Sequence, residues 1–131
     1  MPNEQRFVFD TNVVISTFLL KSCVARQAFD KAIQVGKFLI LRATVEELND
    51  VLRRKGFEKY VTEEERMEFL SAFVTDGVLV DIVERVMACR DSKDDKFLEL
   101  AVNGKATCIV SNDQDLLVLH PFRGIAIMTP R

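Results

Sequence analysis

An acidic residue interrupts the most hydrophobic segment of this 131-residue chain. Asp10 follows the apolar run FVF and precedes Thr11 and Asn12, after which the apolar residues resume. Because an unpaired buried charge is costly, Asp10 is expected either to cap the start of a helix or to lie beside a cation.

Three further acidic positions stand next to apolar segments: Glu47, the pair Asp94-Asp95, and Asp113, which follows the run CIVS. Carboxylates that are brought together repel one another, and this repulsion raises their pKa values unless a cation neutralises them. A site with only oxygen ligands favours Mg²⁺ or Mn²⁺. These residue types therefore predict a site for one of these ions, provided that the fold gathers the acids.

Five short apolar runs predict the strands that would position these acids, at residues 6–9, 38–41, 78–81, 107–111 and 125–128. Most runs are too uniformly apolar for alternation, which is typical of strands buried on both faces. Four predicted helices separate them: one from Ser22 to before Gly36, one opened by the capping-box spacing at 44–47 and stopped at Gly56, one over 66–75 after the box at 62–65, and one over 94–103. This alternation predicts one α/β domain over residues 1–131, with three α/β/α layers around a mostly parallel sheet of about five strands.

In such a sheet, sites form where the strands end, beside the N-termini of helices. Asp10, Glu47, Asp94 and Asp113 are all expected at this edge. The helical phase of the apolar residues directs Glu47 and Asp94 towards the core, whereas a phase error of one residue would favour Asp95.

Some of these acids also have a purely structural explanation. Glu47 would be the glutamate of a capping box, and Asp94 or Asp95 would be a favourable charge in the first turn of a helix. This explanation fits Asp10 less well, because its strand is expected to be central and buried. The arrival of four acids at one edge favours a metal site over coincidence.

The chain resembles the PIN-domain family of metal-dependent ribonucleases, in the prokaryotic branch of toxins from toxin–antitoxin pairs. The resemblance is carried by five segments in order: VFDTNVVIS, TVEELNDVLRRKGF, CRDSKDDKFLELA, CIVSNDQDLL and IMTP. Together they span nearly the whole chain, and the ordered set is far more specific than its Asp-Thr-Asn opening. One departure is Asn112, where related sequences often have Gly.

This resemblance implies acidic residues that bind Mg²⁺ or Mn²⁺ and act in catalysis: Asp10, Glu47, Asp94 and Asp113, with Asp95 as a further candidate ligand. It also implies supporting residues around them: Thr11, Asn12 and Asp115. A bound metal would lower the pKa of a water, orient its in-line attack on a phosphodiester and stabilise charge on the leaving 3′ oxygen. RNA as substrate and an antitoxin protein as partner are the implied ligands.

The remaining charged residues say less about function. His120 is the one histidine of the chain, and a metal-free ribonuclease normally needs such groups near neutral pH. A basic run follows the Glu47 helix: Arg53, Arg54 and Lys55, with Lys59 beyond it. Cations at a helix C-terminus are commonly structural, yet these four are also the best local candidates for guiding an RNA backbone.

The overall composition excludes several classes of protein. A net charge of −2 and a pI near 5.5 lack the excess of base that marks many nucleic-acid binders. Three widely spaced cysteines without a C-x-x-C pair argue against zinc and disulfide frameworks, and predict free thiols in a reducing cytoplasm. The apolar segment 7–20 is too short to span a membrane.

Apolar residues on the predicted helices at 22–36 and 66–75 predict a homo-oligomer or a bound partner.

Two other functions fit less of the sequence. A non-catalytic PIN-like domain would use the same fold to bind RNA or protein, and metal titration with an RNA cleavage assay would separate the two. A Mg²⁺-dependent phosphotransfer domain is the other alternative. A phosphatase of that kind needs a second Asp two residues after the first, where Asn12 stands. A receiver needs paired acids after its first strand, where FVFDTN offers one, and an isolated Asp at the end of a middle strand, where FLILRAT offers none.

Overall fold

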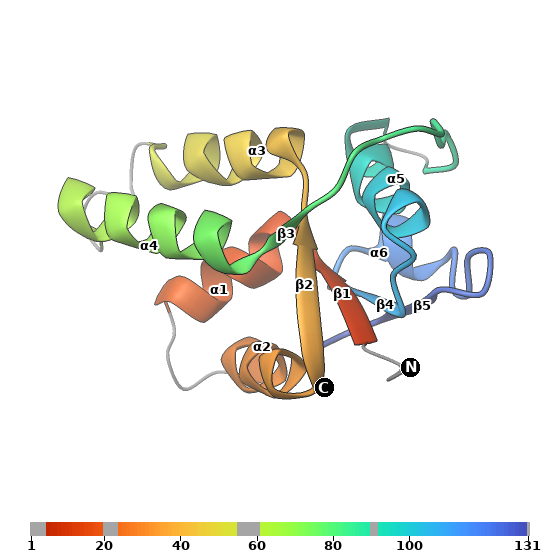
Figure 1. Ribbon diagram of the computed structural model, residues 1–131, viewed down its shortest axis with the longest axis horizontal. Coiled ribbons are helices and arrows are strands. Elements are labelled where there is room, and N and C mark those ends of the chain that lie inside the picture. The colour runs from red at the N-terminus through yellow and green to blue at the C-terminus, as the bar shows by residue number, and fades with distance from the viewer. Residues whose placement is uncertain (1–4, 20–23, 55–60, 90–91, 131) are drawn as a thin grey trace.

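Five parallel strands form the centre of the computed structural model, in the order β3-β2-β1-β4-β5 (Figure 1). The structure describes residues 5–19, 24–54, 61–89 and 92–130. The strands are β1 (Gln5–Phe9), β2 (Gly36–Ile40), β3 (Val78–Leu79), β4 (Cys108–Val110) and β5 (Ala126–Met128). The helices are α1 (Thr11–Leu19), α2 (Val24–Val35), α3 (Arg42–Leu52), α4 (Glu63–Asp76), α5 (Asp95–Asn103) and α6 (Gln114–Leu117), with a 3₁₀ turn, η2 (Ser92–Asp94), leading into α5.

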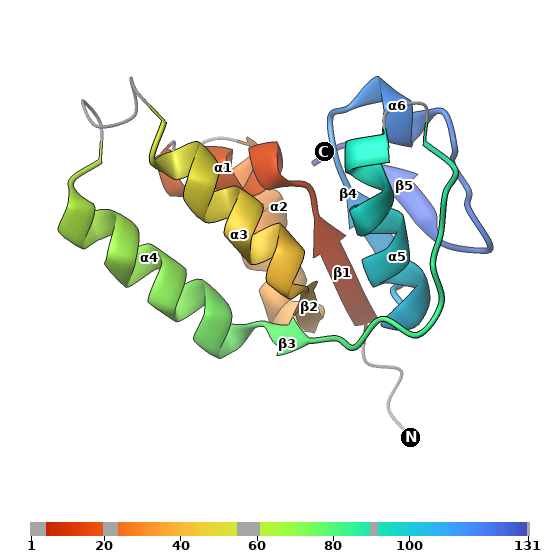
Figure 2. The same ribbon diagram turned by 90° about the horizontal axis from the view of Figure 1, so that it is seen from above.

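Helices cover both faces of the sheet, as the uniformly apolar strands predicted. Figure 2 shows α1 to α4 on one side and α5 and α6 on the other. Successive strand residues alternate between the two layers, since side chains point to opposite faces along a strand. Phe9 and Val110 pack towards α1 to α4, whereas Val8 and Ile109 pack towards α5 and α6. The predicted three-layer α/β/α architecture is confirmed, with all strand pairs parallel.

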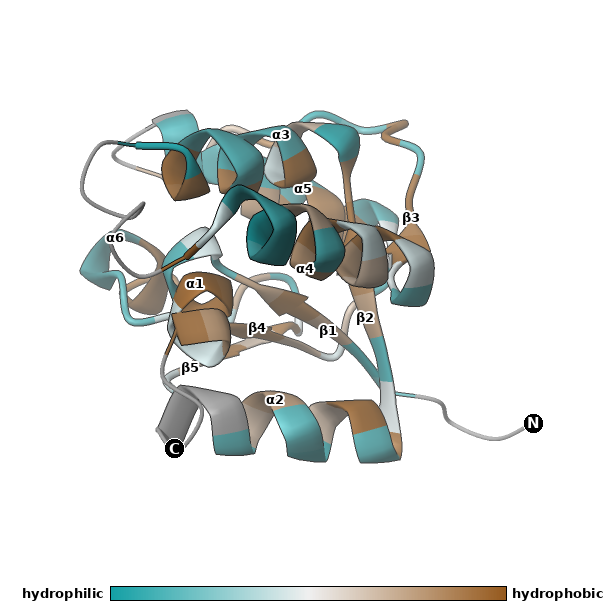
Figure 3. Ribbon diagram, turned by 90° about the vertical axis from the view of Figure 1, so that its left-hand side faces the viewer, coloured by the Kyte–Doolittle hydropathy of each residue, from teal (hydrophilic) through white to brown (hydrophobic). Residues whose placement is uncertain are grey.

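Helix α1 was not among the predicted helices. Its sequence, TNVVISTFL, is apolar almost all round. Figure 3, in which hydrophobic residues are brown, shows α1 as largely brown. Val13, Val14 and Ile15 are each at most 6% exposed. A helix buried on most sides has no polar face, so no amphipathic period marks it in the sequence.

The predicted start of the helix that carries Glu47 is wrong. Helix α3 begins at Arg42, and the Thr44 hydroxyl bonds back to Leu41, accepting from its N–H at 3.1 Å and donating to its carbonyl at 2.8 Å. Thr44 is therefore the third residue of the helix rather than its cap. Glu47 consequently lies in the second turn, so it is not the glutamate of a capping box.

The predicted capping box at the start of α4 is confirmed. Thr62 accepts from the Glu65 N–H at 3.0 Å, and Glu65 accepts from the Thr62 N–H at 2.9 Å. The helix begins at Glu63, before the predicted range of 66–75, and β3 is two residues shorter than predicted. The predicted stop signal at Gly56 and the cap at Ser22 lie outside the described residues.

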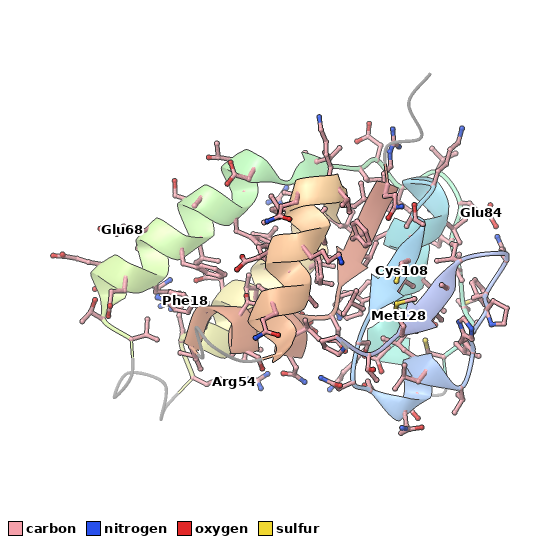
Figure 4. All side chains as sticks on the ribbon, turned by 90° about the horizontal axis from the view of Figure 1, so that it is seen from below. Phe18, Arg54, Glu68, Glu84, Cys108 and Met128 are labelled. Atoms are coloured by element: carbon pink, nitrogen blue, oxygen red, sulfur yellow. The ribbon has the colours of Figure 1, made fainter. Side chains whose placement is uncertain are left out.

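Most apolar residues that predicted an oligomer are used inside the fold. On α2 and α4, Ala32 and Phe73 are buried, and Phe29, Phe69 and Leu70 pack against the core. Ile33 and Met67 are 48% and 55% exposed. A groove of about 510 Å³ lies beside α2 where it leaves β4 and β5 uncovered, and Figure 4 shows Cys108 and Met128 on this face of the sheet. The homo-oligomer stays a prediction, with a weaker basis than the sequence provided. No helix within the described ranges is both long and apolar enough to cross a bilayer.

Candidate metal centre

Asp10 lies where the chain passes from the central strand into α1. Its N–H donates to the Val110 carbonyl at 3.0 Å, and its own carbonyl accepts from the N–H groups of Val13 and Val14 at 3.0 and 3.1 Å. The backbone of Asp10 thus belongs to both the sheet and the first helical turn. Its Oδ1 lies 3.4 Å from the Asn12 nitrogen, near the outer limit for a hydrogen bond, so its side chain is only a weak cap.

The second oxygen of Asp10 has a stronger partner, Ser111. The Ser111 Oγ donates to Oδ2 at 2.7 Å and accepts from the Asp113 N–H at 2.9 Å. Ser111 is completely buried, and Asp10 is 6% exposed. One hydroxyl therefore connects the carboxylate of Asp10 to the backbone of Asp113.

The surroundings of Asp10 disfavour its negative charge. Burial raises the pKa of Asp10 above its usual value, and the hydrogen bonds from Ser111 and Asn12 oppose this effect. The negative charges of Asp113 and Glu47 raise the pKa further. A cation close to these three acids would reverse the effect of their repulsion.

Three carboxylates come together close to Asp10 and Ser111. Asp94, Asp113 and Asp115 each place one ligand oxygen within 4.8 Å of the others, and all three side chains are half-buried. Asp94 ends η2, and Asp113 precedes α6, where its Oδ1 accepts from the Asp115 N–H at 2.9 Å. Asp115 was predicted only as a supporting residue, but it lies in the cluster itself. Three oxygen ligands of this kind suit a hard divalent cation.

Glu47 is not part of that cluster, and both of its oxygens have other partners. The Thr11 hydroxyl donates to Oε1, and the Lys96 ammonium lies 2.7 Å from Oε2. The Lys96 and Glu47 side chains are 18% and 31% exposed, so the pair is shielded from solvent on most sides. Thr11 thus supports a predicted acidic residue directly, whereas the exposed Asn12 offers its backbone N–H to Asp10.

The neighbouring acids Asp94 and Asp95 have different environments. The Oδ1 of Asp95 accepts from the N–H groups of Ala88 and Cys89, at 3.0 and 2.8 Å. Burial alone would raise the pKa of Asp95, but these bonds and one from the Cys89 thiol hold the pKa below its usual value. Asp95 therefore stabilises the segment before α5 through hydrogen bonds, whereas Asp94 belongs to the cluster with Asp113 and Asp115. The role of either as a metal ligand stays a prediction.

The Cys89 thiol lies at the border of the acidic site. Burial, a hydrogen bond to Asp95 and the charges of Asp95, Asp94 and Asp113 raise its pKa to about 12. The thiol is therefore protonated at neutral pH in the metal-free protein.

The predicted basic run is only partly described. Arg53 and Arg54 are exposed beyond the last turn of α3, and Figure 4 shows Arg54 at that end. Lys55 and Lys59 lie outside the described residues. His120 holds a structural contact, because its Nδ1 accepts from the Ile127 N–H at 2.9 Å.

Sequence analysis missed two residues of the site, Ser111 and Lys96. Each contacts an acid that is distant in the chain, so no local spacing reveals the contact. The signal available for Ser111 was a hydroxyl at the end of an apolar strand, directly before an acidic turn. For Lys96 it was a cation in the first turn of a helix, where a positive charge is unfavourable unless it has a partner.

Comparison with known proteins relates the whole arrangement to one family. A family profile described as PIN domain matches residues 6–115. The uncharacterised protein MJ1680 of Methanocaldococcus jannaschii is 28% identical over 125 residues, which cover 88% of this chain and 75% of that protein. A chain of VapBC2 from Rickettsia felis, solved bound to a DNA fragment from their promoter, has a TM-score of 0.64 at 11% identity, covering 94% of this chain and 97% of that one. PAE2754 from Pyrobaculum aerophilum has a TM-score of 0.63 at 16% identity, covering 95% and 83%.

Proposed function

Because the chain belongs to the PIN-domain family, we propose that it is an endoribonuclease that hydrolyses RNA phosphodiester bonds with Mg²⁺ or Mn²⁺. One observation carries this proposal: the carboxylate oxygens of Asp94, Asp113 and Asp115 lie within 4.8 Å of one another. Asp10 is tied to this cluster through Ser111. The cluster lies at the carboxyl edge of the parallel strands, where sites of α/β proteins form.

The residues of this edge fit a hard divalent ion. Asp94, Asp113 and Asp115 offer three oxygens at once, and Asp10 and Glu47 supply further carboxylates close by. When bound, such an ion supplies a Lewis acid for the phosphodiester and a water whose pKa is lowered.

The other side chains orient these acids. Ser111 fixes the carboxylate of Asp10 and the backbone of Asp113 at the same time, and the Thr11 hydroxyl fixes one oxygen of Glu47. The repulsion from Asp113 and Glu47 that raises the pKa of Asp10 would be relieved by a bound cation, which favours cation binding at this site.

The proposal is tested by cleavage of a labelled single-stranded RNA in the presence of Mg²⁺ or Mn²⁺. Asp113→Asn should lower the rate at least a hundredfold, because a neutral amide is a poor ligand for a hard cation. Asp76→Asn, at the exposed end of α4, is the matched control and should keep the wild-type rate. Full activity in excess EDTA would refute the metal mechanism.

We also propose that the protein acts as the toxin of a toxin–antitoxin pair. The support is the structural similarity to a chain of VapBC2, which was solved on promoter DNA. Expression of the chain alone should arrest growth, and co-expression of a small DNA-binding protein encoded next to it should relieve the arrest. Growth that is unaffected by the chain would argue against this role.

A non-catalytic domain is the second candidate function, and one observation favours it. Both oxygens of Glu47 are already engaged, by Thr11 and Lys96. A protein that binds RNA without cleaving it, and that does not bind Mn²⁺, would support this candidate.

A further inference from the structure

The ion pair between Lys96 and Glu47 differs from the surface ion pairs of the fold. In the pairs Arg42–Glu46 and Arg123–Glu84, every side chain is at least half exposed, and in Arg66–Glu63 the glutamate is 84% exposed. Lys96 and Glu47 are 18% and 31% exposed, and their charged atoms are 2.7 Å apart. A pair that is shielded in this way is screened less by salt and interacts more strongly than a surface pair.

Lys96 is also close to the proposed metal cluster by its position in the chain. It lies in the first turn of α5, directly after Asp94 and Asp95, and its ammonium is 5.1 Å from the centre of the Phe97 ring. The positive end of the helix dipole lies at this turn, so a lysine there is unfavourable without a negative partner. Glu47, reached from α3, is that partner.

The pairing separates Glu47 from the other acids. The three oxygens that lie close together come from Asp94, Asp113 and Asp115, while the two oxygens of Glu47 face Thr11 and Lys96. A divalent ion that takes Glu47 as a ligand either shares Oε2 with the ammonium or replaces it there, because a carboxylate oxygen has two lone pairs. The ion also has to bind beside a positive charge that the helix keeps near the site.

We propose that Lys96 is a positioning residue that competes with the divalent ion for Glu47 and thereby sets the metal affinity of the site. This inference rests on the metal site proposed above. In the metal-free protein, Lys96 takes the place of the cation at Glu47 and limits repulsion among the acids. In the metal-bound protein, the ion holds Glu47 and the Lys96 ammonium is released.

The test is a calorimetric titration of Mn²⁺ into the wild type and two variants of Lys96. Lys96→Met removes the charge but keeps a chain of similar length, so the Kd for Mn²⁺ should fall about tenfold or more. Lys96→Arg keeps the charge, and its Kd should stay within about threefold of the wild type. Lys31→Met, on the exposed face of α2, is the control for loss of one positive charge and should leave the Kd unchanged.

An unchanged or higher Kd in Lys96→Met would overturn the inference, since a purely structural lysine would give that result. Absence of Mn²⁺ binding in the wild type would instead refute the metal site itself. A measurement on the unaltered chain covers the case in which the variant does not fold. The ¹⁵N resonance of the Lys96 ammonium should shift as Mg²⁺ saturates the site, and a resonance that stays constant through saturation would contradict the competition.

Discussion

The Ser111 hydroxyl donates a 2.7 Å hydrogen bond to the Asp10 carboxylate, joining two residues that are 101 positions apart. Both side chains are buried. The bond links the ends of the adjacent strands β1 and β4, so the geometry of the acidic edge depends on their pairing.

Replacing Ser111 by Ala should destabilise the protein by about 1–3 kcal/mol at neutral pH, because it leaves buried oxygen and N–H groups without a partner. Urea unfolding of the metal-free protein measures this difference. Ser71→Ala, on the exposed face of α4, is the matched control and should change stability little. Equal losses in both variants would mean that the Ser111 bond contributes nothing specific.

Replacing Asp10 by Asn should leave the metal-free protein as stable as the wild type or more stable at pH 7. The folded-state pKa of Asp10 is raised by burial, so its favourable contribution is present below the unfolded pKa of about 3.9 and is lost as the pH rises through the folded value. Between pH 3 and pH 7, the unfolding free energy of the variant should therefore increase relative to that of the wild type as the pH rises. A constant difference across this range would contradict the raised pKa.

Asp94 and Asp95 offer a comparison between neighbours. Asp95→Ala should cost about 1–2 kcal/mol at pH 7, because the N–H groups of Ala88 and Cys89 lose their acceptor. The folded pKa of Asp95 is lowered, so this cost should shrink as the pH falls below about 4 and the wild-type carboxyl is protonated. Asp94→Ala should cost less stability and weaken Mn²⁺ binding more. The reverse order in the two measurements would make Asp95 the ligand.

Arg53 and Arg54 should act on RNA binding rather than on chemistry. Replacing both by Gln should raise the KM for RNA several-fold, leave kcat unchanged and reduce the dependence of binding on salt, since each phosphate contact adds to that dependence. Lys31→Gln, on the exposed face of α2, is the control for loss of a surface charge. A KM that is unaffected at low salt would assign the two arginines to the stability of α3.

The regular elements were predictable where a pattern is local. The five strands follow from their apolar runs, and the start of α4 follows from Thr62 and Glu65, whose mutual hydrogen bonds involve only neighbouring residues. Helix α3 was placed three residues too late, because Leu41 and not Thr44 is its cap, and the Thr44 hydroxyl bonds back to Leu41 instead of forward. A threonine followed by glutamate three residues later permits either arrangement.

The site was predictable in its acids but not in their partners. Asp10 and Asp113 were found because strand ends converge at one edge, which is a rule of topology. The choice of Ser111 for Asp10 and of Lys96 for Glu47 depends on side-chain packing between elements that are far apart in the chain. No spacing in the sequence encodes such contacts.

The central claim is that the acidic edge holds a divalent ion, and calorimetric titration of Mn²⁺ into the purified protein tests it most directly. The account predicts saturable binding to the wild type, at least tenfold weaker binding to Asp113→Asn, and wild-type binding to Asp76→Asn. No saturable binding to the wild type, or equal binding to all three proteins, would contradict it.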